Sequence, residues 1–121
     1  MIDVERELRA GAPNLLREPA PFGMFAGAGW LPLLRETLTK LERIAEKLPA
    51  NERPKILGAK QKFGELRLSI SGGNEECRLV ADEAECLSNL VCEDCSLPGE
   101  LRTGSYLRTL CAGCYVARGT F

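Results

Sequence analysis

The sequence predicts an α+β fold with a long helix, a β-hairpin, a second helix and a C-terminal zinc ribbon in one small domain. Apolar residues recur every three or four positions from 31 to 48, and they alternate with polar residues from 65 to 71. Two Cys-x-x-Cys pairs then follow, and a length of 121 residues suits a single domain. We expect an N-terminal loop or arm at 1–28, an α+β core at 29–91, and a zinc-ribbon subdomain at 92–121 packed on that core.

The N-terminal segment is expected to be mostly irregular. Residues 2–9 predict a short helix, after which glycine and proline interrupt any regular element. We expect Gly11 to Ala28 to lie over the core as a loop, anchored by Phe22, Met24 and Phe25.

The strongest helical pattern begins after Trp30. Pro32 is allowed in the first turn, and Pro49 disfavours helical geometry at the residue before it. The apolar stripe of this helix consists of Leu31, Leu34, Leu38, Leu41, Ala45 and Leu48.

A β-hairpin is expected next. Leu66, Leu68 and Ile70 point to one side of a strand whose other side is polar. The preceding residues 55–61 can pair with it through a turn near Phe63 and Gly64.

The second helix should begin after Asn74, whose side chain can cap it. Two apolar faces predict burial on both sides: one carries Cys77, Val80, Ala84, Leu87 and Val91, and the other carries Leu79, Cys86 and Leu90. Cys77 and Cys86 lie nine residues apart, about 180° around the helix, so they cannot form a disulfide. Both are expected to be small buried hydrophobic residues.

Four cysteines form the clearest chemical motif. Cys92 and Cys95 are followed, after fifteen residues, by Cys111 and Cys114. Each pair can place two thiolates on one tetrahedral ion, and the intervening residues suit a hairpin that bends at 103–105. Zinc is the expected ion, and a closed four-thiolate site would be structural, contributing about 10 kcal/mol to folding. An iron–sulfur cluster also accepts four cysteines, and two disulfides remain an alternative.

Composition excludes several classes of function. The chain has no histidine, hence no imidazole base, no histidine-based catalytic triad and no histidine metal ligand, and we expect it not to be an enzyme. No apolar run is long enough for a membrane span, and the first residues lack the pattern of a signal peptide. A cytoplasmic protein is therefore expected.

Charge is unevenly distributed although the formal net charge is only −1. Residues 35–67 hold nine basic and five acidic side chains, whereas residues 75–94 hold seven acidic and one basic. The acidic segment could attract a basic partner. Within the ribbon, three arginines balance three acids, which makes nucleic-acid binding there improbable, although the basic residues of 55–67 could still contact phosphates.

Several segments together resemble a widespread, largely uncharacterised family of small bacterial and phage proteins that couple a KFG-x-LR strand to a C-terminal zinc ribbon. The matching segments are Gly27-Ala28-Gly29-Trp30, Lys62-Phe63-Gly64-Glu65-Leu66-Arg67, Ser71-Gly72-Gly73, and Cys92 through Pro98-Gly99-Glu100-Leu101-Arg102 to Leu107-Arg108-Thr109-Leu110-Cys111. The chain departs from the family pattern where it has Cys114 in place of histidine and Tyr106 in place of tryptophan. Some members lie near toxin genes, so the resemblance implies an immunity or adaptor role.

The leading hypothesis is a non-catalytic, zinc-stabilised immunity protein that binds and neutralises a cognate bacterial toxin. The alternative is a nucleic-acid-binding zinc-ribbon regulator or phage accessory protein. Candidate partner contacts lie on the second helix and at the hairpin tip: Glu75, Glu76, Asp82, Glu83, Glu85, Arg102, Ser105, Tyr106 and Arg108.

Overall fold

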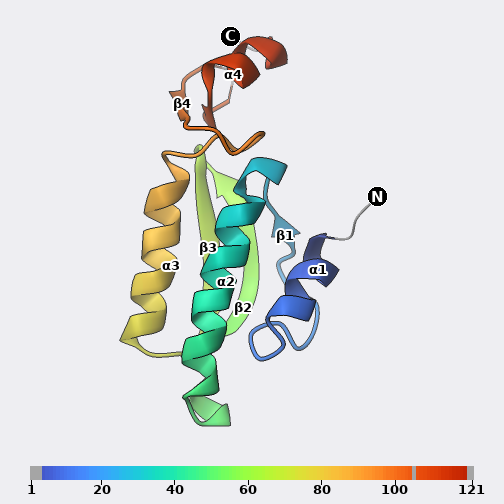
Figure 1. The fold of residues 1–121 in the computed structure, drawn as a ribbon, viewed down its shortest axis with the longest axis vertical. Helices are drawn as coiled ribbons and strands as arrows, with labels where there is room; N and C mark the ends of the chain where they lie inside the picture. The colour runs from blue at the N-terminus through green and yellow to red at the C-terminus, as the bar shows by residue number, and fades with distance from the viewer. Residues whose placement is uncertain (1–3, 105, 120–121) are drawn as a thin grey trace.

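The computed structural model describes residues 4–104 and 106–119, and it confirms the α+β fold. Two helices, α2 and α3, lie side by side on one face of a three-stranded sheet, while the ribbon extends beyond the end of both (Figure 1). The elements in chain order are α1 Val4–Gly11, β1 Met24–Phe25, η1 Ala28–Trp30, α2 Leu31–Glu46, η2 Ala50–Glu52, β2 Lys55–Lys62, β3 Glu65–Ser71, α3 Glu75–Ser88, β4 Glu100–Arg102, β5 Arg108–Leu110 and α4 Ala112–Arg118.

The long helix is α2, and it forms as its periodicity predicts. Pro32 occupies the first turn, where its missing N–H costs no helical hydrogen bond. Leu34, Leu38, Leu41 and Ala45 are all buried, so the apolar stripe faces the sheet and the neighbouring helices.

The predicted hairpin is β2 and β3, paired antiparallel. Phe63 and Gly64 form the turn, both with positive φ, which matches the twist of a two-residue hairpin loop. Leu66 and Leu68 are buried under the helices. The sheet gains a third strand because β1 pairs parallel to β2.

The prediction that α3 is buried on both sides is wrong. Its N-cap forms as expected, since the Asn74 side chain accepts a hydrogen bond from the Cys77 backbone N–H at 3.1 Å. Cys77 is buried, but Leu79 and Cys86 are exposed, so only one side of the helix packs on the sheet and α2, and Leu90, expected on the helix, is exposed beyond its end at Ser88. A two-layer fold covers one side of each helix, and the other side of α3 faces solvent.

The N-terminal segment also differs from its prediction. The helix at 2–9 forms as α1 from Val4, and residues 2 and 3 lie outside the described part of the chain. Phe22 and Phe25 are 66% and 71% exposed and Met24 is half-buried. The loop is held instead by four buried apolar side chains, namely Ala12, Leu15, Leu16 and Ala20.

The reason is the pairing of β1 with β2. Phe25 is paired with Lys60, whose exposed side chain lies on the face of the sheet away from α2 and α3. Paired residues share a face, so this register directs Phe25 outward. The loop is further fixed to α2 by Glu42, a buried carboxylate that accepts a hydrogen bond from the Asn14 backbone N–H at 3.0 Å.

Candidate metal centre

The first cysteine pair lies in a tight turn that follows α3. Cys92 is buried, its N–H donates to the Leu97 carbonyl at 2.7 Å, and its carbonyl accepts from the Ser96 N–H at 3.0 Å. Ser96 has a φ of 73°, the left-handed conformation that reverses the chain. These contacts close the turn, which we call the first knuckle (residues 92–95).

The second knuckle (residues 111–114) begins α4. Cys111 is the N-cap residue, and its Sγ accepts a hydrogen bond from the Cys114 N–H at 3.4 Å. Strands β4 and β5 pair antiparallel and bring this knuckle back to the first one, as the sequence predicts. Ser105, in the expected bend, lies outside the described residues.

The four predicted ligands come together at one point. The Sγ atoms of Cys92, Cys95, Cys111 and Cys114 all lie within 4.8 Å of one another, and those of Cys95 and Cys111 are 3.6 Å apart. Tetrahedral bonds of about 2.3 Å place ligand sulfurs about 3.8 Å apart, so the cluster has the dimensions to hold one metal ion. All six cysteines of the chain are free thiols, so no two of them are joined in a disulfide.

Crowding of the thiols changes their acidity. The Cys114 backbone N–H, helped by neighbouring thiols, lowers the pKa of Cys111 to about 7. The pKa of Cys114 is strongly raised, chiefly by Cys95 and then by Cys111. Loss of one proton from the cluster, at Cys111, is therefore favoured, whereas loss of a further proton at Cys114 is disfavoured. This is the behaviour expected of a site whose thiols ionise fully only when a cation binds.

The glycine-rich segment before α2 is where the first knuckle docks. The Gly29 N–H donates to the Glu93 carbonyl at 2.8 Å, and Trp30 Nε1 donates to the Val91 carbonyl at 2.9 Å. A Cβ on Gly29 would lie 2.1 Å from the Cys92 carbonyl oxygen, so only glycine permits this approach. Trp30 itself is fully buried.

The turn of the β2–β3 hairpin holds the other side of the ribbon. Thr109 Oγ1 donates to the Gly64 carbonyl at 2.6 Å, and Gln61 Nε2 donates to the Leu107 carbonyl at 2.8 Å. The Gly-Ala-Gly-Trp and Lys-Phe-Gly segments, far apart in the sequence, thus both bind the cysteine-bearing ribbon, each on a different side of it.

Glu93 is a buried residue at this interface whose role the sequence did not reveal. Its side chain is only 5% exposed, pairs with Arg108 at 3.0 Å, and accepts from the Thr109 N–H at 3.2 Å and from Gln61 Nε2 at 3.4 Å. By sequence, Glu93 is one of the seven acids of residues 75–94. Its place between Cys92 and Cys95 is the one sequence signal that could have marked it as part of the ribbon.

Of the acids proposed as partner contacts on α3, four are exposed, namely Glu75, Glu76, Asp82 and Glu83. Glu85 is half-buried, and its carboxylate accepts a hydrogen bond from the Leu68 N–H at 2.9 Å, so the expectation of a free acid there is wrong.

Glu85 acts with Ser88, whose Oγ accepts from the Leu66 N–H at 2.9 Å. Both donors lie on the edge of β3 away from β2. The two side chains of α3 therefore satisfy an edge that would otherwise be open to pairing with another strand.

The candidate partner contacts on the β4–β5 hairpin differ in how far neighbouring residues already hold their side chains. Arg102 is half-buried, lies over the Tyr115 ring at 4.8 Å, and pairs with Glu100 at 2.9 Å. Tyr106 is exposed, with the Arg108 guanidinium 5.6 Å from its ring centroid.

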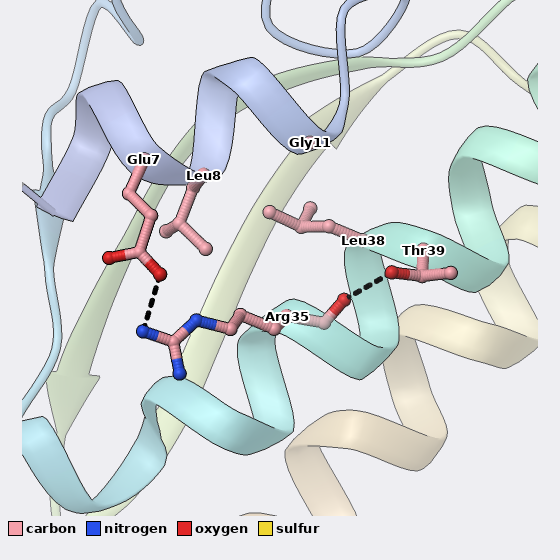
Figure 2. Close-up of a pocket in the computed structure, with 6 residues that line it drawn as sticks. All are labelled: Glu7, Leu8, Gly11, Arg35, Leu38 and Thr39. Atoms are coloured by element: carbon pink, nitrogen blue, oxygen red, sulfur yellow. Dashed lines mark hydrogen bonds and ion pairs between the residues drawn. The ribbon is translucent and has the colours of Figure 1, made fainter.

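A cavity of about 250 Å³ lies between α1 and α2 (Figure 2). Leu8 and Leu38 point into it, and an ion pair between Glu7 and Arg35 crosses its opening. The two charged side chains at this cavity bind one another, so neither is available to a ligand. We interpret the cavity as a gap between packed helices, and the cysteine cluster remains the better candidate site.

Comparison of the chain with protein-family models, with curated proteins and with solved structures finds no match. In the part of the chain that the structure describes, no helix combines the length and apolarity that crossing a membrane requires.

Proposed function

We propose that the two knuckles bind one structural zinc ion and that the protein acts without catalysis, by binding a protein partner. The observation that carries the zinc proposal is the convergence of four Sγ atoms within 4.8 Å. Four protein ligands complete a tetrahedral zinc ion and leave no position for a substrate, so the ion would stabilise the ribbon. A reducing cytoplasm, where thiols persist, is the setting that suits such a site.

The same spacing favours one ion over a four-iron cluster. Such a cluster places its cysteine ligands on separate iron atoms at the corners of a cube, further apart than the ligands of a single ion. A single iron ion would fit the distances, but thiolate sites of this closed kind are the usual structural sites of zinc.

The test of this centre is metal analysis of the purified protein. We expect one zinc per chain by native mass spectrometry, and a Co²⁺-substituted form with the absorption of a tetrahedral thiolate site. Cys95→Ser should weaken zinc binding severely, whereas Cys86→Ser should not, because Cys86 is exposed and outside the cluster. A folded protein without metal, or one that contains iron, would contradict the proposal.

The exposed side of α3 supports the choice of a protein partner. Apolar Leu79 lies exposed on α3, which also presents exposed acids, and Leu90 is exposed just beyond the end of the helix. Apolar side chains surrounded by charges of one sign suit a partner surface that is apolar at its centre and basic at its rim. The resemblance described above makes a cationic bacterial toxin the first partner to test, with this protein as its immunity protein.

The functional experiment is growth rescue. The chain is coexpressed with a toxin-like protein encoded beside its own gene, and we expect cells to survive. Glu76→Lys should slow association with that toxin, whereas Glu46→Lys, an exposed acid on α2, serves as the matched control. Failure of rescue, or equal association rates for both variants, would refute the immunity proposal.

A further inference from the structure

The sheet has a second face, opposite α2 and α3, that carries mostly basic side chains. In the register of β2 and β3, Lys60 is opposite Arg67, and Lys62 is opposite Glu65. Residues opposite each other share a face, and the intervening Leu66 is buried beneath the helices, so these four side chains lie on the other side. We call this the outer face.

The single acid of this set does not cancel its positive charge. The Glu65 carboxylate pairs with Arg67 at 3.6 Å and accepts from Asn89 Nδ2 at 3.2 Å. Lys60 and Lys62 are exposed, so the outer face offers basic groups to solvent. The four exposed acids of α3, namely Glu75, Glu76, Asp82 and Glu83, belong to a helix that packs against the opposite face.

Aromatic rings accompany these basic groups. Phe25 shares the outer face with Lys60 through the pairing of β1 with β2, and Phe63 at the hairpin turn is 67% exposed. Lys62 Nζ lies 5.6 Å from the Phe63 ring centroid. Large aromatic side chains are costly to leave in water, and several in one region mark a surface that binds something.

Phe63 also borders a recess between the hairpin turn and the ribbon. The recess has a volume of about 330 Å³ and is lined by Gln61, Phe63, Tyr106, Leu107 and Arg108. Tyr106 is 69% exposed, so two rings border this recess. The outer face therefore carries Phe25 beside Lys60 and Phe63 beside Lys62, and the recess adjoins it at Phe63.

We propose that the outer face binds single-stranded RNA. Lysine and arginine neutralise phosphates, while exposed aromatic rings stack on unpaired bases, and the combination is typical of single-strand binding. The exposed hydroxyls of Ser69 and Ser71, on the same face of β3 as Arg67, can contact the 2′-hydroxyl that distinguishes RNA from DNA. Paired bases in a duplex would be inaccessible to the rings.

This surface is distinct from the exposed side of α3, so the inference does not depend on the protein-binding proposal. The charge balance of the ribbon alone disfavours nucleic-acid binding. Only the register of the sheet gathers Lys60, Lys62 and Arg67 beside the aromatic rings on one face.

The test is fluorescence anisotropy with zinc-loaded protein and a labelled oligouridine of about ten nucleotides. Three phosphate contacts predict an affinity about twentyfold lower at 200 mM than at 50 mM salt. Phe63→Ala should weaken binding at least about fivefold through lost stacking. Val116→Ala, which truncates an exposed apolar side chain on α4, is the matched control and should bind as the unaltered protein does.

Charge is tested separately from stacking. Lys60→Glu should weaken binding and reduce the salt dependence, whereas Lys47→Glu, at the end of α2, should have little effect. Circular dichroism and zinc content verify that each variant is folded.

Three results would overturn the inference. The first is no binding of oligouridine, the second is equal binding of an oligodeoxyuridine of the same length or of duplex RNA, and the third is binding that is unaffected by Phe63→Ala in a folded variant.

Discussion

Gly29→Ala should separate the first knuckle from the start of α2. The new Cβ would lie 2.1 Å from the Cys92 carbonyl oxygen, 2.6 Å from the Glu93 carbonyl carbon and 2.7 Å from the Asp94 nitrogen. All three are backbone atoms, so no side-chain rotation relieves the contact. The knuckle must move away by about 1 Å to restore ordinary van der Waals separation.

That movement weakens three hydrogen bonds across the interface. They join the Gly29 N–H to the Glu93 carbonyl at 2.8 Å, Ser96 Oγ to the Gly29 carbonyl at 2.7 Å, and Trp30 Nε1 to the Val91 carbonyl at 2.9 Å. With a net contribution of about 0.5–1.5 kcal/mol each, their loss lowers the free energy of unfolding by about 2–4 kcal/mol. For a domain of this size the midpoint of thermal unfolding should fall by about 10 °C.

The assay is urea denaturation of the zinc-loaded protein, followed by far-ultraviolet circular dichroism, with the slope m compared between variants. Gly113→Ala is the matched control, since a Cβ there has nothing within 4 Å and the residue lies inside α4. It should be neutral or stabilise by up to about 1 kcal/mol. An unfolding free energy for Gly29→Ala within about 0.5 kcal/mol of the unaltered protein would refute the reasoning.

Three further predictions concern the interface, the sheet edge and the metal. Glu93→Ala should cost about 2–3 kcal/mol in urea denaturation, because it leaves the half-buried Arg108 without its carboxylate, and a neutral result would contradict this. Glu85→Ala should cost about 1 kcal/mol and increase aggregation, measured by light scattering, since the Leu68 N–H loses its acceptor, whereas the exposed Glu83→Ala should do neither. Chelation, or a fall of pH that protonates the thiolates, should release zinc and speed amide hydrogen exchange in the ribbon before the helices, and uniform protection throughout would count against a structural ion.

Local features of the fold were predictable because their causes are local. The apolar period of α2, the left-handed turn at Phe63 and Gly64 and the Asn74 cap each depend on residues within a few positions of one another. The spacing of the cysteines likewise predicts two knuckles, and the antiparallel pairing of β4 with β5 brings them together.

The errors have a common physical origin. Leu90 belongs to an apolar set, and Phe25 has a large apolar side chain, yet both are exposed, because burial depends on what packs opposite a residue. No second layer covers the outer side of α3, and the register of β1 turns Phe25 to the outer face. A sequence pattern shows which faces of a helix or strand are apolar, but it does not show which elements pack against those faces.

The sequence by itself determined helices α2 and α3, the β2–β3 hairpin and the four sulfur ligands, because periodicity and spacing act along the chain. Only the tertiary structure decided that Glu93 pairs inside the ribbon interface and that Glu85 protects the edge of β3. An acid's role is set by the donors it meets, and here those donors, Arg108 and the Leu68 N–H, lie fifteen and seventeen residues away along the chain.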